Sequence, residues 1–226
     1  MQEATAEAIP GKRAKPMPRK QRRAQLLGVA RRIVHDGGIG ALTMSGLAEQ
    51  SGASKPVVYE HFQNSEAVAV ALLEDYFRTM IELVANRAKK AETLEEYLSI
   101  AVDAQFEFHT TDRLVVRSIT NGHSSSERVN AIYRDMRDHS VETLQELLSQ
   151  QGASDAESET AGYLLWEMIS SAVFEFAMAP NADAKADTLK KMLIGAVHAV
   201  VPEAKARPVT PAKILEAARA MRQPKT

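Results

Sequence analysis

The sequence has no cysteine, which excludes disulfide bonds and thiolate metal sites. No apolar run approaches the roughly 20 residues that a membrane-spanning helix needs, and the N-terminus lacks the apolar core of a secretory signal. The chain also lacks a glycine-rich phosphate loop, a nucleophile elbow and any strand pattern longer than a few residues. We therefore expect a cytoplasmic protein with no membrane segment and no cofactor.

The net charge of −1 conceals an uneven distribution of charge along the chain. Residues 1–63 contain 10 Lys or Arg and 5 Asp or Glu, a balance of +5. The remaining residues contain 18 basic and 24 acidic side chains, a balance of −6. A basic N-terminal part joined to an acidic remainder indicates that only the N-terminal part meets a polyanion.

Apolar residues recur at spacings of three and four along most of the chain, which predicts an all-α protein of about nine or ten helices. We expect a three-helix unit over residues 19–63, followed by a helical part over residues 64–202. In this second part, one helix should end near Phe106, and a shorter helix should begin at Thr111 or Asp112.

The two ends of the chain differ in composition from the helical parts. Residues 1–18 contain proline, glycine and few large apolar groups, which predicts a disordered arm. Its run of basic residues suits either solvent or the backbone and minor groove of DNA. Residues 203–226 predict a linker that leads into either a frayed tail or a short amphipathic helix.

Residues 43–62 predict a helix, a tight turn and a second helix. Thr43 can cap the first helix through its hydroxyl, and Gly52 supplies the positive φ at which that helix ends. Ser54 is placed to cap the second helix, with Pro56 in its first turn.

The second helix of this motif has one apolar side and one mixed side. Val58 and Phe62 lie four residues apart and should face inward. The opposite side suits a DNA major groove, because Lys, Tyr and His bond phosphate oxygens and small apolar groups contact a thymine methyl. A surface helical hairpin without any DNA contact fits the same pattern. The residues pointing away from the apolar side are Lys55, Val57, Tyr59 and His61.

The residues of this motif closely resemble the DNA-binding motif of the TetR family of transcriptional regulators, over about residues 22–73. The resemblance implies a helix-turn-helix DNA-binding domain followed by a helical domain that binds an effector and dimerises. Two positions depart from the pattern. Ser65 stands where the family usually has a phosphate-binding Lys. Gly46 lies inside a helix, where Gly costs about 1 kcal/mol relative to Ala; close approach to DNA or to a neighbouring helix would explain it.

From this resemblance we expect a ligand-responsive regulator, a repressor by hypothesis, that binds a palindromic operator as a homodimer. The residues expected at base edges are Ser45, Lys55, Pro56 and Val57. Those expected at phosphates are Thr43, Ser54, Tyr59 and His61, with Arg19 and Lys20 in the basic run before them.

The family dimerises through its last two helices and binds its effector inside the second domain. Here the eighth predicted helix, about 155–178, is apolar nearly all round, and the ninth has a continuous apolar stripe ending before Pro202. The implied pocket would suit a lipophilic effector, with an arginine or histidine for an acidic group. Ordinary core packing explains the same aromatic side chains. The candidate pocket residues are Phe106, His109, Arg113, Arg117, Tyr133, Met136 and Trp166.

Three alternatives remain at this point. A metal-assisted hydrolase would use Glu107, His109, Asp112, His123 and Glu127, but their spacing matches no metal motif, and we expect neither a metal nor enzymatic activity. The basic N-terminus also suits a membrane surface, although it lacks bulky apolar anchors. Finally, the chain would have the same fold if it sensed a partner protein or no small molecule.

Overall fold

The structure is a computed structural model that describes the backbone of residues 17–122 and 126–201, and the side chains in these ranges except at 110–113 and 121–122. Throughout the described ranges the regular elements are helices, which confirms the all-α prediction. The N-terminal unit consists of α1 (Arg19–Gly37), the 3-10 turn η1 (Ile39–Ala41), α2 (Met44–Ser51) and α3 (Lys55–His61). The second part consists of α4 (Ser65–Ala88), α5 (Leu94–Gly122), α6 (Glu127–Gln151), α7 (Asp155–Phe176) and α8 (Ala182–Val200).

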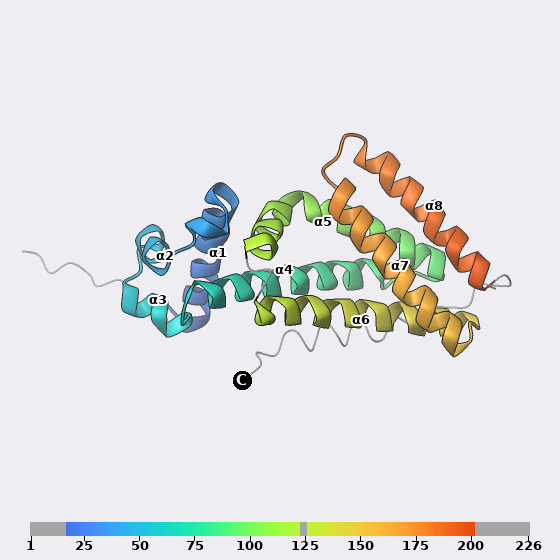
Figure 1. Ribbon diagram of the computed structural model, residues 1–226, viewed down its shortest axis with the longest axis horizontal. Helices are drawn as coiled ribbons and strands as arrows, with labels where there is room; N and C mark the ends of the chain where they lie inside the picture. The colour runs from blue at the N-terminus through green and yellow to red at the C-terminus, as the bar shows by residue number, and fades with distance from the viewer. Residues whose placement is uncertain (1–16, 123–125, 202–226) are drawn as a thin grey trace, which may run out of the picture.

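The helices form an elongated molecule, with α1, α2 and α3 gathered at one end (Figure 1). From this unit α4 extends into the second part, where it packs against α5 and α6. Its inner residues are buried along the whole length, from Val68 to Ala88. The helices α7 and α8 pack against each other, and α7 also covers α6. The predicted eighth and ninth helices are therefore α7 and α8.

The helix ends follow the capping residues of the sequence. The Thr43 hydroxyl accepts a hydrogen bond from the Gly46 amide at 3.0 Å, as predicted. The first helix of the motif ends at Gly52, which has a φ of 68°. At α7, Ser154 and Glu157 bond each other's backbone amides in a reciprocal capping box. These local bonds satisfy amides that a helix start leaves without partners.

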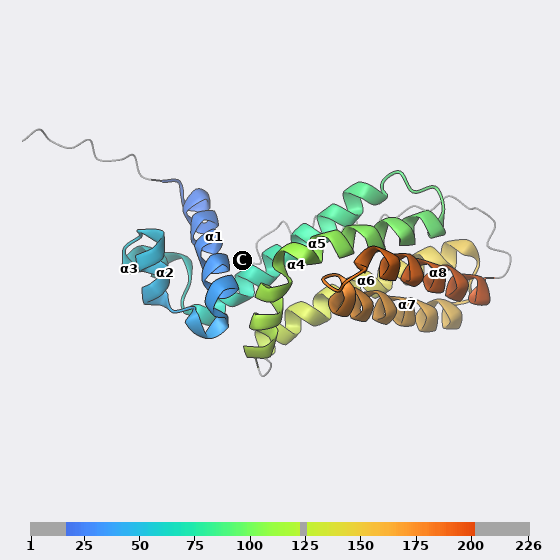
Figure 2. The ribbon, with the colours of Figure 1, turned by 90° about the horizontal axis from the view of Figure 1, so that it is seen from above.

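The predicted break before residue 111 is wrong, because α5 continues from Leu94 to Gly122 as one helix. Its polar stretch around Thr111 weakens helix propensity only slightly, whereas the buried residues Val115 and Ile119 continue its packing. In place of a break, α5 changes direction along its length (Figure 2). This change brings its C-terminal end against α1 and η1.

The N-terminal unit is joined to the second part by specific polar contacts. The Ile39 amide donates a hydrogen bond to the Ser118 hydroxyl of α5 at 2.7 Å. On α1, Arg31 forms an ion pair with Asp75 of α4 at 3.0 Å.

The proposed division into two domains near residue 63 stays a prediction. The predicted arm falls almost wholly, and residues 203–226 entirely, outside the described residues.

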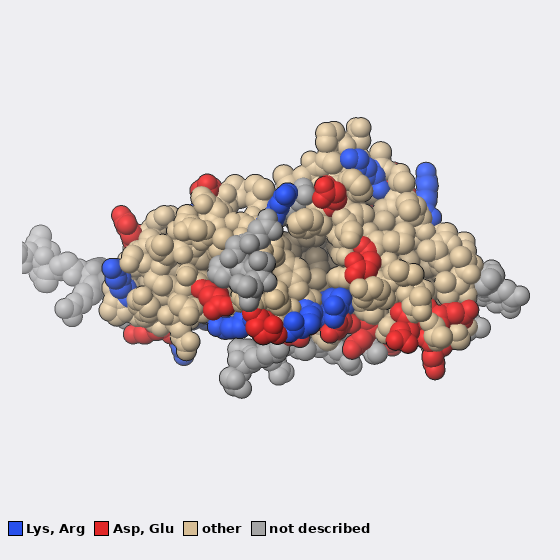
Figure 3. Space-filling model, viewed as in Figure 1, with Lys and Arg blue, Asp and Glu red and all other residues tan. Residues whose placement is uncertain are grey.

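Charges and apolar groups occupy different parts of the surface. Figure 3 shows Asp and Glu side chains gathered over the turn that joins α6 to α7, at the end of the molecule away from α3. No helix in the described ranges is both long and apolar enough to cross a membrane.

The helices α6 and α7 approach each other closely at Gly162. A Cβ at this position would lie 2.7 Å from Gln145 Cγ and 3.1 Å from the Gln145 backbone nitrogen. Gly28, in the middle of α1, has no atom within 4 Å of the equivalent position. The absence of a side chain at Gly162 therefore allows these two helices to pack closely.

We predict that Gly162→Ala lowers the free energy of unfolding by about 1 kcal/mol, because overpacking of about 1–3 kcal/mol exceeds the gain in helix propensity of about 1 kcal/mol. The matched control, Gly28→Ala, should raise it by about 0.5–1 kcal/mol, since only helix propensity changes. Urea denaturation followed by circular dichroism measures both. Equal effects of the two variants would contradict the close approach.

Candidate nucleic-acid interface

The motif of α2 and α3 forms the predicted helix-turn-helix. Val58 is fully buried and Phe62 nearly so, and both pack in the core of the N-terminal unit together with Leu47 of α2. Their burial fixes which side of α3 faces outward. Tyr59 is 53% exposed on that side, although aromatic side chains of its size are usually covered.

The residues predicted to contact DNA lie together at one end of the molecule. An open depression of about 570 Å³ at the turn of the motif is lined by Ser45, Ser54 and Lys55, among others. Ser54 lies at the N-cap position of α3, but its hydroxyl makes no capping bond, which corrects that expectation. The exposed members of the set are Arg19, Lys20, Thr43, Ser45, Ser54, Lys55, Pro56 and Tyr59, whereas Val57 and His61 are half-buried.

The C-terminal end of α3 is fixed by a residue that sequence analysis missed. The Arg23 guanidinium donates a hydrogen bond to the His61 carbonyl at 3.2 Å and lies over the Phe62 ring at 4.5 Å. Arg23 therefore positions α3 relative to α1. It is less free to follow DNA than its place just after the basic residues Arg19 and Lys20 suggested. The helix spacing between Arg23 and the buried Leu26 was the available signal, because it places both on one side of α1.

The environment of His61 reduces its basicity. Burial, together with the positive charges of Arg19 and Arg23, lowers the pKa of this imidazole. His61 is therefore neutral near pH 7 in the free protein. In that state it can donate one hydrogen bond but contributes no full charge to the surface.

The two departures from the family pattern have structural accounts. A Cβ on Gly46 would lie 3.0 Å from the Thr43 hydroxyl oxygen, which crowds the cap of α2. No neighbouring helix approaches it within 4 Å, so helix packing does not explain this glycine. Ser65 is half-buried at the first position of α4, directly after Asn64, whose side chain caps the helix.

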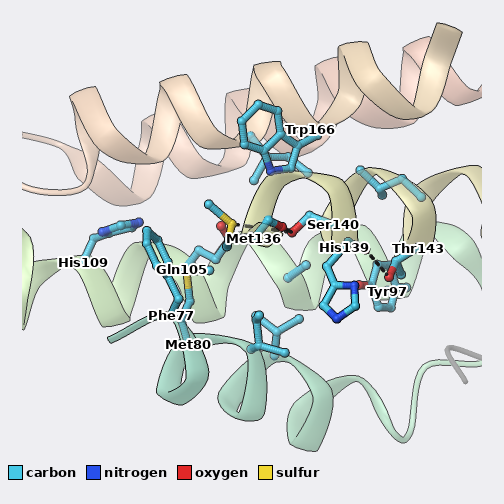
Figure 4. Close-up of a pocket in the computed structure, with 15 residues that line it drawn as sticks. Phe77, Met80, Tyr97, Gln105, His109, Met136, His139, Ser140, Thr143 and Trp166 are labelled. Carbon is cyan, nitrogen blue, oxygen red and sulfur yellow. Dashed lines mark hydrogen bonds between the residues drawn. The ribbon is translucent and has the colours of Figure 1, made fainter. Parts of the chain in front are cut away.

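A cavity of about 100 Å³ lies among α4, α5, α6 and α7 (Figure 4). Three predicted pocket residues, His109, Met136 and Trp166, line it. Figure 4 shows His109 and His139 at opposite ends of the lining, with Trp166 of α7 on one side. The lining is mostly aliphatic and aromatic, with a few polar groups. Sequence analysis missed the polar residues Tyr97, Gln105, His139, Ser140 and Thr143.

The other predicted pocket residues lie elsewhere. Phe106 is buried in the core outside the cavity lining, and Arg117 is exposed. Tyr133 packs edge-on against Phe77 with ring centroids 5.0 Å apart, which makes it a core aromatic beside the cavity. The side chain of Arg113 lies outside the described residues.

The cavity-lining residues of α6 follow a pattern visible in the sequence. Met136, Ser140 and Thr143 recur at spacings of four and three, which places them on one side of a helix. The hydroxyls of Ser140 and Thr143 interrupt the apolar stripe on this side, so the sequence did not indicate that these two residues line a cavity. The Thr143 and Ser140 hydroxyls donate to carbonyls one turn earlier in α6, which satisfies them inside the helix.

One wall of the cavity contains a buried polar pair. The hydroxyl of Tyr76, on α4, is hydrogen-bonded to His109 Nδ1, on α5, and both side chains are buried. Phe108 packs on the Tyr76 ring, with centroids 4.9 Å apart. At the other end, burial raises the pKa of Tyr97, so its phenol stays protonated. These groups give the cavity hydrogen-bonding capacity.

The described residues of the hydrolase hypothesis take part in separate contacts. Glu107 forms a bidentate ion pair with Arg87 on the surface, at 2.8 and 2.9 Å. Glu127 pairs with Arg134 at the start of α6. The side chains of Asp112 and His123 lie outside the described residues. Within the described part of the chain, no three His, Cys, Asp or Glu side chains are grouped as metal ligands.

The outer surface of α7 and α8 exposes large apolar side chains. Leu164 of α7 is 55% exposed and Met192 of α8 is 57% exposed. The two helices lie side by side (Figure 2). The other exposed apolar side chains of these two helices and of the turn between them are Tyr163, Phe176 and Met178.

Part of the sequence and the fold of the chain are similar to those of known proteins. Residues 26–72 match the family described as bacterial regulatory proteins, tetR family. The transcriptional activator FasR of Mycolicibacterium smegmatis is 27% identical over 146 residues, which cover 64% of this chain and 67% of FasR. The fold is shared with the fatty acid degradation regulator FadR from Bacillus halodurans, with a TM-score of 0.64 and 17% identity over 80% of this chain and 97% of that one. A TetR-family transcriptional regulator from Streptomyces coelicolor has a TM-score of 0.66 and 18% identity over the same shares, 80% and 97%.

Proposed function

We propose that this chain, whose residues 26–72 match the tetR family of bacterial regulatory proteins, binds a palindromic DNA operator as a homodimer and regulates transcription in the cytoplasm in response to a lipophilic small molecule. The observation that supports DNA binding most directly is the outward side of α3. That side exposes Lys55, Pro56 and Tyr59 while Val58 and Phe62 secure the helix from behind. An exposed helix of this composition matches the dimensions and chemistry of a major groove.

In this proposal the exposed residues divide into two roles. Ser45, Lys55, Pro56 and Val57 face base edges. The hydroxyl, imidazole and basic groups around them bond phosphates, because they surround the motif where a DNA backbone would pass. This second set consists of Arg19, Lys20, Thr43, Ser54, Tyr59 and His61.

The apolar surface of α7 and α8 is the proposed dimer interface. Large exposed apolar patches on a globular protein commonly mark such a site, because burying them removes apolar area from water. A two-fold axis through this surface would leave both copies of α3 free. Two such helices, related by symmetry, match the two half-sites of a palindrome.

The cavity is the proposed effector site. Its volume of about 100 Å³ is smaller than the pockets of about 300–1,000 Å³ that bind drug-sized ligands. Entry of such a ligand therefore requires the surrounding helices to move apart. The mostly apolar lining favours a lipophilic molecule, and the polar groups near its two ends favour one with a hydrogen-bonding group.

Of the helices that line the cavity, α5 is hydrogen-bonded to the DNA-binding unit, and α6 is hydrogen-bonded to the start of α4, the helix that follows this unit. Ser118 near the end of α5 accepts the hydrogen bond from Ile39. Ser126, which caps α6, donates a hydrogen bond to Glu66 at the start of α4, 2.5 Å away. Ligand entry that displaces either helix would thus shift α4 and change the separation of the two recognition helices. Such a shift requires the ligand to bind the DNA-incompetent state more tightly.

The direction of regulation has two candidates. Release from DNA on ligand binding would make the protein a repressor, which is the mechanism proposed here. The second candidate is an activator, and the name of the relative FasR, which describes an activator, favours it. A reporter gene behind the operator, compared with and without the chain, separates the two.

The DNA-binding role can be tested by the salt dependence of operator binding. Operators are first isolated by genome-wide footprinting, and affinity is then measured by fluorescence anisotropy at several salt concentrations. We predict that Lys55→Ala reduces the slope of log K against log salt by about 1 per subunit if Lys55 neutralises a phosphate. The control, Lys90→Ala beyond the end of α4, should leave the slope unchanged. An unchanged slope in Lys55→Ala would mean that this residue reads a base or makes no DNA contact.

The effector site can be tested through Trp166, the chain's single tryptophan, which lines the cavity. We predict that one class among acyl, steroid and drug-like molecules changes its fluorescence and weakens operator binding at the same concentration. Ala101→Leu extends a side chain from α5 into the cavity and should weaken this ligand about tenfold, as overpacking of 1–3 kcal/mol implies. Fluorescence changes that leave operator affinity unaltered would contradict an effector role.

The dimer interface can be tested by placing a charge on it. We predict that Leu164→Glu and Met192→Glu each convert the dimer to monomers in analytical ultracentrifugation, because a carboxylate buried without a partner is costly. Operator affinity should fall about 100-fold as the two linked half-sites separate. Leu114→Glu, which changes a similarly exposed leucine on α5, is the control. Dimers that persist in both interface variants would exclude this surface.

A further inference from the structure

One acidic side chain lies on the proposed DNA-reading side of α3. Glu60 is exposed, and it lies two residues from Val58 and two from Phe62, the buried residues of this helix. At about 100° per residue, Glu60 points almost directly away from Val58. Pro56, four residues earlier, is exposed on the same side. Glu60 therefore lies on the outward side of α3, near its C-terminal end, where it can face a groove.

The surroundings of Glu60 leave its carboxylate available for an interaction outside the chain. Among the described residues, the ion pairs of the N-terminal unit involve Arg31 and His35 but not Glu60. The positive charges of Arg19, Arg22 and Arg23 and the negative charge of Glu60 all act on the neighbouring His61. A carboxylate in this place is unfavourable next to phosphates, because like charges repel.

A cytosine in the major groove can offset this repulsion. A carboxylate accepts a hydrogen bond from the N4 amino group of cytosine, whereas the exposed edges of guanine offer it only acceptors. Adenine also presents a donor, its N6 amino group, but beside the N7 acceptor, which repels a carboxylate, and thymine presents an acceptor and a methyl group. An acidic residue on the outward side of a recognition helix therefore discriminates between base pairs rather than adding affinity to all of them.

We propose, as an extension of the proposed function, that Glu60 is a specificity-determining residue that accepts a hydrogen bond from one cytosine in each operator half-site. It lowers the affinity of the chain for duplexes that lack this cytosine. The negative charge thus excludes non-operator DNA, while Lys55 and the hydroxyl groups around the motif supply attraction.

The test is a selection of duplexes from a random library with the full-length chain and with Glu60→Gln. The wild type should select a palindrome with one invariant C·G pair per half-site, preferred about 10- to 100-fold over the other pairs, as a good base contact allows. The Gln amide binds adenine N6 and N7, so Glu60→Gln should select A·T at this position alone. A second variant, Glu60→Ala, should lose the preference without gaining a new one.

The control is Glu74→Gln, which removes an exposed carboxylate from α4, outside the helix-turn-helix motif, and should leave every base preference unchanged. If Glu60→Gln binds all sequences more tightly and retains the wild-type base preferences, Glu60 acts only as a charge and the assignment is wrong. A wild-type chain that enriches no duplex would overturn the proposed function together with this assignment. A wild type that selects an operator with no preferred C·G pair would overturn the assignment alone.

Discussion

The hydrogen bond from the Ile39 amide to the Ser118 hydroxyl joins parts of the chain that are 79 residues apart in sequence. It attaches the end of α5 to the unit that contains the helix-turn-helix. A second bond, from Ser126 to Glu66, attaches the start of α6 to the start of α4. Because α5 and α6 also line the cavity, a displacement there would reach the proposed DNA-binding surface through packed helices rather than through a flexible linker.

Three surfaces with different chemistry lie in different parts of this frame. The exposed side of α3 combines polar, charged and aromatic groups, and the cavity combines apolar walls with a few polar groups. The outer side of α7 and α8 exposes large apolar side chains. Their separation allows each to meet a different partner at the same time: a polyanion, a small molecule and a second copy of the chain. The proposed regulation depends on this simultaneous occupation, since coupling requires distinct sites and more than one global state.

Local signals predicted the helix-turn-helix well and the cavity poorly. The cap at Thr43, the glycine after α2 and the inward pair of Val58 and Phe62 are each determined by residues within one or two turns. The cavity instead combines residues from four helices, so His109 and Trp166 could be proposed only among other aromatic groups that turned out to be core. Arg117 was wrongly placed there, because its exposure depends on how α5 bends.

The sequence by itself determined the all-helical class, the helix-turn-helix and the uneven charge, because periodicity, capping and composition act over short distances. It also indicated that α7 was too apolar for a helix covered by one neighbour. Only the tertiary structure decided that α5 is continuous, that Arg23 secures α3, and which side chains of α6 face the cavity. These features depend on contacts between helices distant in sequence, where packing overrides the weak preferences of single residues.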